Sequence, residues 1–410
     1  MKVAFISQPW NRVVPPVESG SVAIWNYQVA RRLAPAFPVT IYAAGGDGTG
    51  NVARSDGVEY RYVATSIDRR MLRGLRHWSR LRSSKRSFFA SGLYYLEYIV
   101  KVSLDLRKRH YDIVHIQNLS QFAPVVRALN PGVRILLHMH CEWLTQLDSS
   151  LIRPRLEKTD MIVGCSDYIT EKIRRRFPSV ASRCRTVYNG VDVRLNETRN
   201  GRKNGAAKRV LFVGRISPEK GLHVLLEAFQ QVVRAYPDVE LDIVGPQAAP
   251  PVAFIFKLSD DPKVAGLVAH CNGDYLTALK EQVPAELRQR VSFSGAIPHS
   301  VLAARYAAAD IYVQPSLIEA FPLPIPEAMA AGVPVVGTRV GGIAEAITDR
   351  VTGRLVDSND AETLAEAIVD LLSDEPSRRS MGQSARARAL ERFSWEHVAE
   401  DLLGVYQSMS

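Results

Sequence analysis

The amino-acid sequence predicts an α/β protein made of two similar halves joined by a linker. Short apolar runs typical of buried strands alternate with amphipathic stretches of helical period through most of the 410 residues. The alternation stops in the polar, glycine-containing stretch 195–205 and then starts again. Strands separated by helices favour parallel pairing, and a chain of this length exceeds what one hydrophobic core serves. We therefore predict an N-terminal domain over 1–194 and a C-terminal domain over 206–393.

The first half contains six apolar runs that read as strands. These runs are Val3–Ser7, Val39–Ala43, Val58–Ala64, Tyr111–Ile116, Arg134–His138 and Asp160–Val163. Helices are expected over Val22–Leu33 and from about Gln121 and Asp167, where apolar residues recur at helical spacing. The region 69–109 is expected to be largely helical for the same reason.

The second half repeats this pattern with one interruption. Its strand runs are Arg209–Val213, Val239–Val244, Val291–Ser294, Ile311–Val313 and Val333–Gly337, and its helices are Gly221–Tyr236, Glu362–Leu372 and Trp395–Tyr406. Residues 246–284 contain several prolines and do not fit the alternation. We interpret this segment as an insertion near the rim of the ligand site.

The positive charge of the chain is concentrated in one segment. The sequence carries 52 Lys+Arg against 42 Asp+Glu, a formal net charge of +10. Residues 69–109 contain twelve of the cations and two of the acids, so the net charge of this segment equals the net charge of the whole chain. Its first cations are Arg69, Arg70, Arg73 and Arg76. A local basic surface suits an anionic membrane, a phosphate-bearing ligand or nucleic acid, although a solvated helix face remains the alternative.

Signals for export or membrane insertion are not evident. The apolar run at the N-terminus is too short for the core of a signal peptide, and the stretch 90–104 is interrupted by Glu97 and Lys101. The four cysteines lie far apart and form no Cys-x-x-Cys pair, which favours reduced thiols. We expect a cytoplasmic protein, with peripheral contact to the inner face of the plasma membrane.

The first group of residues suited to chemistry follows the strand run Arg209–Val213. Gly214 and Arg215 end this run, and Lys220 stands just before the next helix. Two cations at a strand end and a helix start can clamp a diphosphate, since helix N–H groups add to the same field. The alternative is that both cations are simply solvated.

The second group is a pair of glutamates after the strand run Ile311–Val313. Glu319 lies in the loop, and Pro326 suits the first position of a helix that would place Glu327 in its first turn. A carboxylate in such a loop can accept hydrogen bonds from two sugar hydroxyls. Capping of helix N–H groups is the structural alternative for Glu327.

The third group is His138-Met-His140 at the end of another strand run. A metal site is disfavoured because no third ligand has convincing spacing. A neutral histidine that contacts sugar hydroxyls or phosphate is preferred, and packing in the core remains open. Gly20, after the first strand, could let the backbone approach a phosphate. Walker, Gly-x-Gly-x-x-Gly, Gly-x-Ser-x-Gly and His-Glu-x-x-His motifs are not found.

Taken together, these groups resemble the family 4 glycosyltransferases, which are retaining enzymes of the GT-B fold. The matching segments are Tyr188-Asn189-Gly190-Val191-Asp192, Gly214 to Gly221, Glu319 to Glu327, Gly341 to Glu345 and Phe393-Ser394-Trp395. Their order and spacing are highly specific, although each alone is modest. The resemblance implies two Rossmann-like domains that face a cleft, with a C-terminal helix over 394–410 that crosses back to the N-terminal domain.

The resemblance also implies roles for individual residues. Arg215 and Lys220 would hold the diphosphate of a nucleotide sugar and stabilise its departure. Gly214, Phe321 and the Gly20 loop would contribute to donor binding. Glu319 would bind the donor sugar, Glu327 the ribose hydroxyls, and His140 would lie near the transferred sugar. The leaving phosphate would accept the proton of the acceptor, so neither a metal nor another cofactor is expected.

The partners follow from the same resemblance. We expect a nucleotide-sugar donor and a saccharide or lipid-linked acceptor used in the synthesis of cell-surface polysaccharide or glycoconjugate, and no nucleic acid. Arg69, Arg70, Arg73 and Arg76 are assigned to the acceptor or membrane surface. The alternative is a non-catalytic GT-B protein that binds sugar nucleotides as an assembly partner, which the intact clamp and glutamate pair disfavour.

Overall fold

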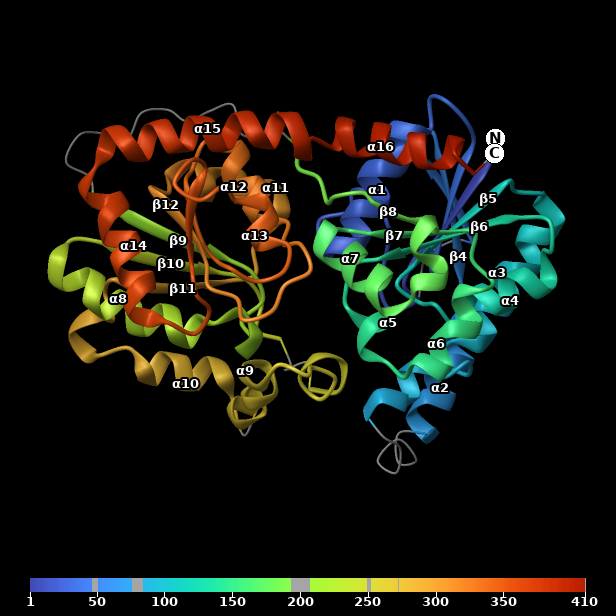
Figure 1. The fold of residues 1–410 in the computed structure, drawn as a ribbon, viewed down its shortest axis with the longest axis horizontal. Coiled ribbons are helices and arrows are strands. Elements are labelled where there is room, and N and C mark those ends of the chain that lie inside the picture. Colours follow the sequence, from blue (N-terminus) through green and yellow to red (C-terminus); the bar gives the residue numbers. More distant parts are fainter. Residues whose placement is uncertain (46–50, 76–83, 193–206, 249–251, 272, 410) are drawn as a thin grey trace. The chain divides into compact units, whose positions relative to one another are not determined.

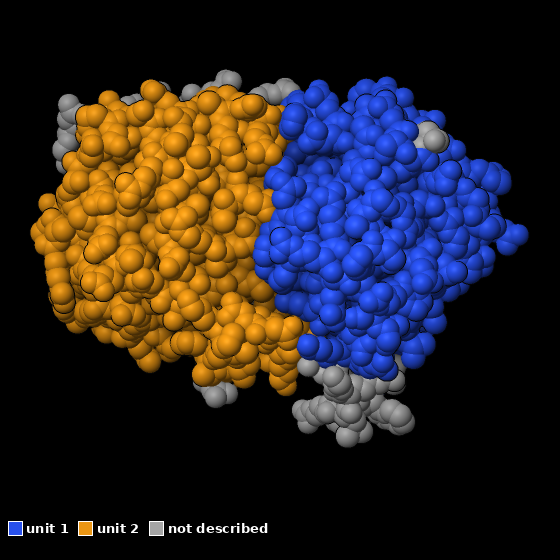
Figure 2. All heavy atoms as spheres, in the orientation of Figure 1, with its two compact units in different colours: residues 1–188, 395–410 blue, residues 189–394 orange. Residues whose placement is uncertain are grey.

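The computed structural model describes the whole chain except residues 46–50, 76–83, 193–206, 249–251, 272 and 410. The chain divides into two compact units. Unit 1 comprises Met1–Tyr188 and Trp395–Ser410, and unit 2 comprises Asn189–Ser394 (Figure 2). The predicted linker 195–205 lies outside the described residues.

In its described part, unit 1 contains an eight-stranded sheet of order β3-β4-β2-β1-β5-β6-β7-β8. The strands are β1 Val3–Ile6, β2 Val39–Ala44, β3 Val52–Ser55, β4 Val58–Val63, β5 Ile113–Gln117, β6 Arg134–Met139, β7 Met161–Gly164 and β8 Cys184–Thr186. Neighbouring strands pair in parallel, except that β3 is antiparallel to β4. The carboxyl ends of the parallel strands therefore share one edge, where ligands bind in sheets of this kind.

Helices connect these strands. They are α1 Ser21–Leu33, α2 Ser66–Leu75, α3 Leu96–Arg109, α4 Phe122–Leu129, α5 Trp143–Gln146, α6 Ser149–Leu156, α7 Asp167–Arg176 and α16 Trp395–Gln407. Most of the described residues of 69–109 lie in α2 and α3, as expected, and short 3₁₀ turns occupy Ser84–Arg86 and Phe88–Ala90.

The C-terminal helix α16 belongs to unit 1, as the sequence predicts. It lies beside α1 (Figure 1). The Tyr406 hydroxyl is 2.7 Å from Nδ1 of His115 in β5, and Arg32 of α1 lies 3.0 Å from the Glu396 carboxylate. The last helix of the chain thus completes the packing of the N-terminal unit.

In its described part, unit 2 contains a six-stranded, all-parallel sheet of order β11-β10-β9-β12-β13-β14. The strands are β9 Arg209–Val213, β10 Glu240–Val244, β11 Val291–Gly295, β12 Ile311–Gln314, β13 Val335–Thr338 and β14 Gly353–Val356. The helices are α8 Leu222–Ala235, α9 Pro262–Ala265, α10 Tyr275–Gln282, α11 His299–Ala308, α12 Pro324–Ala330, α13 Ile343–Ala346, α14 Ala361–Ser373 and α15 Glu375–Phe393. Two parallel-sheet units of this type confirm the predicted α/β class.

Helix α15 is the longest element in the described part of unit 2, and the sequence pattern does not predict it. Its buried face includes the small residues Gly382, Ala385 and Ala389, so the sequence lacks a strong apolar stripe. A Cβ at Gly382 would lie 2.2 Å from the Gly332 carbonyl oxygen, which shows how closely the helix approaches the end of α12. Close backbone approach through small residues replaces a stripe of large apolar side chains here.

Candidate functional site

The residues predicted to clamp a diphosphate lie at the carboxyl edge of the unit 2 sheet. Arg215 follows β9, and Lys220 closes a 3₁₀ turn, Pro218–Lys220, that precedes α8. A guanidinium nitrogen of Arg215 donates to Oε1 of Glu219 at 3.0 Å, and the Ser217 hydroxyl donates to the same oxygen at 2.6 Å. Glu219 is buried while Arg215 is half exposed. A buried carboxylate therefore orients an accessible guanidinium.

Lys220 and Glu319 form an ion pair within unit 2. The Lys220 ammonium donates to Oε2 of Glu319, which lies in the loop between β12 and α12, and both side chains are largely buried. The structure thus brings together a cation of the first predicted group and a carboxylate of the second.

A close backbone crossing holds these two loops together. Gly221 has φ +70°, and a Cβ there would lie 2.0 Å from the Pro315 carbonyl oxygen. The Leu317 N–H also donates to the Glu219 carbonyl oxygen at 2.9 Å. Because only glycine fits this crossing, Gly221 joins the clamp turn to the loop that carries Glu319.

Glu327 lies in the first turn of α12, and both of its oxygens have partners. Nε2 of His299 is 2.7 Å from Oε1, and the Tyr306 hydroxyl donates to Oε2 at 2.7 Å. Burial, together with the charge of Glu327, raises the pKa of Tyr306 well above its usual value, so this phenol remains a donor. The helix begins at Pro324, which places Pro326 at the third helical position and corrects the sequence expectation for this proline.

The backbone around Glu319 is supported from two sides. Gly342 donates its N–H to the Glu319 carbonyl oxygen at 3.3 Å, and a Cβ at Gly342 would lie 2.1 Å from the Ala320 carbonyl oxygen. The Asn189 amide donates to the Phe321 carbonyl oxygen at 2.9 Å, and the Phe321 ring is buried. Phe321 therefore packs inside unit 2 and holds the loop in place.

In unit 1, His140 follows β6 at the carboxyl edge of the sheet, where buried amides fix its ring. Its Nε2 lies 2.8 Å from Oε1 of Gln117, and the Gln117 amide donates to Oδ1 of Asn26 at 2.7 Å. The Gln117 oxygen therefore accepts from the histidine, which places the proton of the neutral ring on Nε2 and the lone pair on Nδ1. Asn26 in turn donates to the Ser7 hydroxyl at 3.2 Å.

His138 does not share the environment of His140. It is fully buried in β6, and His115 of β5 lies against it, with 3.2 Å between Nε2 of His115 and Nδ1 of His138. Burial is the main cause that lowers the pKa of both histidines well below the usual value, and repulsion between neighbouring imidazoles, which acts when they are protonated, lowers it further. The alternative of a core histidine thus holds for His138. Among the described residues, no group of three or more His, Cys, Asp or Glu side chains is placed to hold a metal ion.

Gly20 directly precedes α1 at the same edge of the unit 1 sheet. It adopts φ +81° and supplies no side-chain cap to the helix, whose second turn carries Asn26. Gly20 and Asn26, one member of the amide network that holds His140, therefore belong to the start and the second turn of the same helix. A Cβ added at Gly20 would lie 3.7 Å or more from its nearest neighbours, which are atoms of Ala23 and Asn11. The positive φ, and not a lack of space, therefore favours glycine at this position.

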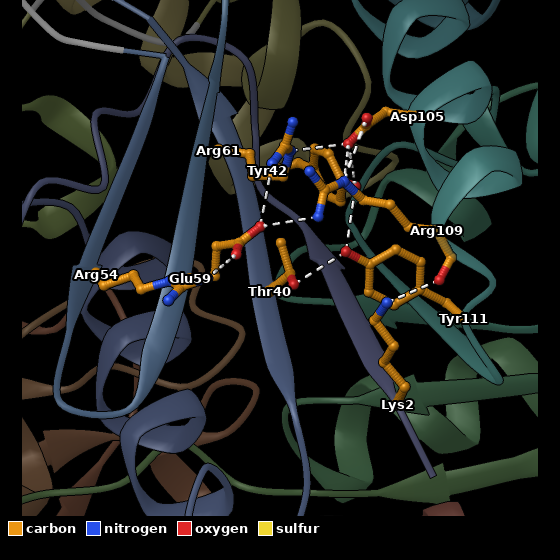
Figure 3. A network of polar contacts seen from close by, with 9 residues as sticks. All are labelled: Lys2, Thr40, Tyr42, Arg54, Glu59, Arg61, Asp105, Arg109 and Tyr111. Atoms are coloured by element: carbon orange, nitrogen blue, oxygen red, sulfur yellow. Dashed lines mark hydrogen bonds and ion pairs between the residues drawn. The ribbon is translucent and has the colours of Figure 1, made fainter.

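The basic segment 69–109 is partly neutralised within unit 1. Figure 3 shows Arg109 between Glu59 and Asp105, with nitrogen–oxygen distances of 3.3 and 3.1 Å. Arg86 likewise pairs with Asp148 at 2.8 Å. These cations serve the fold, so the net charge overstates the basic surface of this segment.

The arginines of α2 are different. Arg69, Arg70 and Arg73 are exposed and form no ion pair within the described part of the chain, while Arg76 lies outside it. Ile67 and Met71 on the same helix are 52% and 41% exposed. Helix α2 therefore presents cations and large apolar side chains together. Within the described residues, no helix is both long and apolar enough to cross a bilayer.

Several side chains of the site carry no recognisable sequence signal. Tyr306, His299 and Gln117 contact the predicted residues from 21 to 28 positions away along the chain. Asn26 in turn contacts Gln117 from 91 positions away. Glu219 stands within the matched segment and could have been singled out as an acid between two cations. Its burial beneath Arg215 follows only from the fold.

Comparison with known proteins agrees with this arrangement. The model for glycosyl transferases group 1 matches residues 193–388, and the model for glycosyltransferase family 4 matches residues 22–195. Spore coat protein SA of Bacillus subtilis is 28% identical over 99% of both chains. The lipopolysaccharide 1,2-N-acetylglucosaminetransferase of Salmonella typhimurium is 26% identical over 94% of this chain and 93% of its own.

The solved structures include a sucrose-phosphate synthase from Thermosynechococcus elongatus with a TM-score of 0.75. It is 24% identical and covers 100% of this chain and 98% of its own, so the likeness concerns the fold. The two parallel-sheet units and the matched family models define a glycosyltransferase of the GT-B type. The chain belongs to the family 4 glycosyltransferases.

Proposed function

We propose that this glycosyltransferase moves a sugar, with retention of configuration, from a nucleoside diphosphate sugar to a hydroxyl group of a saccharide or lipid-linked acceptor. The observation that carries the proposal is the pairing of Lys220 with Glu319 beside the half-exposed Arg215. Cations and a hydroxyl-binding carboxylate thus meet at the sheet edge where ligands of parallel sheets bind.

The pairing suggests how the donor is bound. Lys220 and Arg215 bind the diphosphate as counter-ions. Glu319 then accepts hydrogen bonds from the hydroxyls of the donor sugar in place of its hydrogen bond from Lys220. Glu327, held by Tyr306 and His299, accepts from the ribose hydroxyls. Negative charge grows on the leaving diphosphate in the transition state, and cations already in position stabilise it without reorganisation.

Retention follows from the leaving phosphate acting as the base on the same face of the sugar. The acceptor hydroxyl gives its proton to that phosphate while its oxygen bonds to the anomeric carbon. No protein nucleophile takes part, and we propose that no metal is needed because Arg215 and Lys220 carry the charge. His140, with its lone pair on Nδ1, accepts a hydrogen bond from a sugar hydroxyl.

The acceptor in this proposal is a lipid-linked saccharide used in the synthesis of glycoconjugates. Support comes from the similarity to a lipopolysaccharide-modifying transferase and from the surface of α2. Arg69, Arg70 and Arg73 attract anionic headgroups, each contributing about 1 kcal/mol near such a surface, while Ile67 and Met71 enter the interface. Contact with the inner face of the plasma membrane then brings the acceptor to unit 1.

The clamp is tested by Arg215→Ala and Lys220→Ala with Arg290→Ala as the matched control. Arg290 precedes β11 at the opposite, amino end of the sheet, and pairs with Asp238 at 3.2 Å. We expect each clamp variant to lose about 100-fold or more of donor turnover, and the control to keep it. Wild-type rates in both clamp variants would refute the assignment.

The identity of the reaction is tested with a panel of nucleotide sugars and acceptors. NMR of the product should show the anomeric configuration of the donor, and EDTA should leave the rate unchanged. A product of inverted configuration would refute the retaining mechanism. A loss of activity with EDTA would refute the metal-free mechanism. Donor binding without transfer to any acceptor favours the non-catalytic partner protein instead.

Membrane contact is tested by flotation with vesicles that contain anionic or only zwitterionic lipid. We expect the wild type to float with the anionic vesicles, and the triple variant of Arg69, Arg70 and Arg73 to serine to remain unbound. Exchange of Arg175 and Arg176 of α7 for serine is the control for lost charge on the same unit. Binding that is independent of lipid charge contradicts the proposal.

A further inference from the structure

The segment 246–284, which does not fit the strand–helix alternation, forms a small folded element between β10 and β11. The stretch 252–271 of this segment consists of a π-helical turn, Val252–Phe256, then α9 and a 3₁₀ turn, Gly266–Cys271. Asp261 caps α9 by accepting from the Lys263 N–H at 2.9 Å. These turns pack against one another.

This element has a hydrophobic core of its own. Phe256, Val264 and Leu267 are between 1% and 3% exposed, and the fourth fully buried member of the cluster is Leu317 at 4%. The cluster is separate from the main core of unit 2, which lies between the sheet and helices such as α8 and α14. Three of its buried side chains therefore come from the segment and one from the loop after β12.

Leu317 links this small core to the candidate donor site. It stands two residues before Glu319, and Ile318 between them is a partly buried neighbour of the same cluster. The Leu317 N–H donates to the Glu219 carbonyl oxygen at 2.9 Å. Seating of Leu317 in the small core consequently restrains the backbone from which Glu319 projects.

The same element also contacts the turn that carries Lys220. The 3₁₀ turn Gly266–Cys271 packs against the turn Pro218–Lys220. Burial raises the pKa of the Cys271 thiol, and the charge of Glu219 raises it further, which agrees with this proximity. One hydrophobic support thus lies against both loops whose side chains form the Lys220–Glu319 pair.

We propose that residues 252–271 are a positioning element of the donor site, in which Leu267 and Phe256 act through Leu317 on Glu319. This inference rests on the proposed function, since it assigns to the segment the geometry of the donor-binding pair. A binding group must be held within a fraction of an ångström to favour the transition state, and a locked neighbour provides that restraint. Because the small core is separate, it can loosen while the main core stays folded.

The test compares Leu267→Ala, a position 3% exposed, with Leu371→Ala, at a leucine of the main core in α14 that is 4% exposed. Leu267 belongs to neither site loop, so its truncation leaves every donor contact chemically intact. We expect at least a tenfold loss of kcat/KM for the donor and a comparable loss of nucleoside diphosphate affinity in Leu267→Ala. The Leu371→Ala variant should lower the Tm and keep both values.

Rescue and hydrogen exchange separate positioning from general damage. Leu267→Met keeps the side-chain volume and should restore donor kinetics. In Leu267→Ala, the amide of Leu317 should exchange much faster than in wild type, and this readout requires no activity. Unchanged exchange and unchanged donor kinetics in Leu267→Ala overturn the inference, as does an equal loss of kcat/KM in Leu371→Ala. Faster exchange in a protein whose wild type neither binds nor transfers any donor would uphold the support of the loop and refute the proposed function instead.

Discussion

Two buried histidines should make the stability of unit 1 depend on pH. His115 and His138 are fully buried in adjacent strands, and burial lowers the pKa of both well below the ordinary 6.5. Below pH 6.5 both histidines are protonated in the unfolded chain, whereas they stay neutral in the folded protein. Since the unfolded state then holds more protons, the free energy of unfolding falls as the pH falls through and below 6.5.

The magnitude follows from the linkage relation. A histidine that stays neutral when folded costs stability of RT ln(1 + 10^(6.5−pH)), which is about 2 kcal/mol at pH 5. The two together amount to about 4 kcal/mol, a large part of the stability of an ordinary domain. Paired carboxylates lose their contribution only at lower pH, because their unfolded pKa values lie near 4.

Urea unfolding at a series of pH values between about 5 and 7.5 measures this slope. His138→Gln removes one titrating group and should reduce the loss at pH 5 by about 2 kcal/mol relative to wild type. His110→Asn, at an exposed position with φ 53°, is the matched control and should keep the wild-type slope. Equal slopes for wild type and His138→Gln would show that His138 is not kept neutral by the fold.

Three further predictions concern single contacts. Gly221→Ala places a Cβ 2.0 Å from the Pro315 carbonyl oxygen and should destabilise unit 2 by at least about 2 kcal/mol in urea unfolding, whereas Gly332→Ala, with the same sign of φ and its nearest neighbour at 3.8 Å, should cost about 1 kcal/mol. Tyr306→Phe removes a hydrogen bond to a carboxylate and should cost about 1.5–3 kcal/mol by the same measurement; a neutral result would contradict the pairing. Gln117→Met removes the acceptor of His140 Nε2 and the donor to the buried Asn26 Oδ1, and should cost about 1–3 kcal/mol, with a lower kcat.

Much of the fold could be predicted from local patterns. The runs at Val39–Ala43 and Arg209–Val213 are strands, and Trp395–Tyr406 is the helix that joins unit 1. Elements with weak local signals were missed. Strand β8 has only three residues, and α15 packs through small side chains. Local hydrophobic periodicity is a strong signal only where large apolar residues form the buried face.

The residues of the candidate site could be predicted from the sequence, but the side chains with which they form hydrogen bonds and ion pairs could not. Arg215, Lys220, Glu319 and Glu327 stand in a specific order that can be read without a structure. That Lys220 pairs with Glu319 could not be read, because the two are 99 residues apart in sequence. Their roles toward a donor remain predictions until the clamp variants are measured.

The sequence by itself determined the α/β class, the local concentration of charge, and the strand ends where polar residues gather. Only the tertiary structure decided which cations are available and which are engaged, as with Arg73 on α2 and Arg109 between two carboxylates. It also decided that the irregular segment 252–271 supports the loop of Glu319 through Leu317. The physical reason is that secondary structure depends on neighbours in the chain. Burial and ion pairing depend on which distant segments the folded backbone brings into contact.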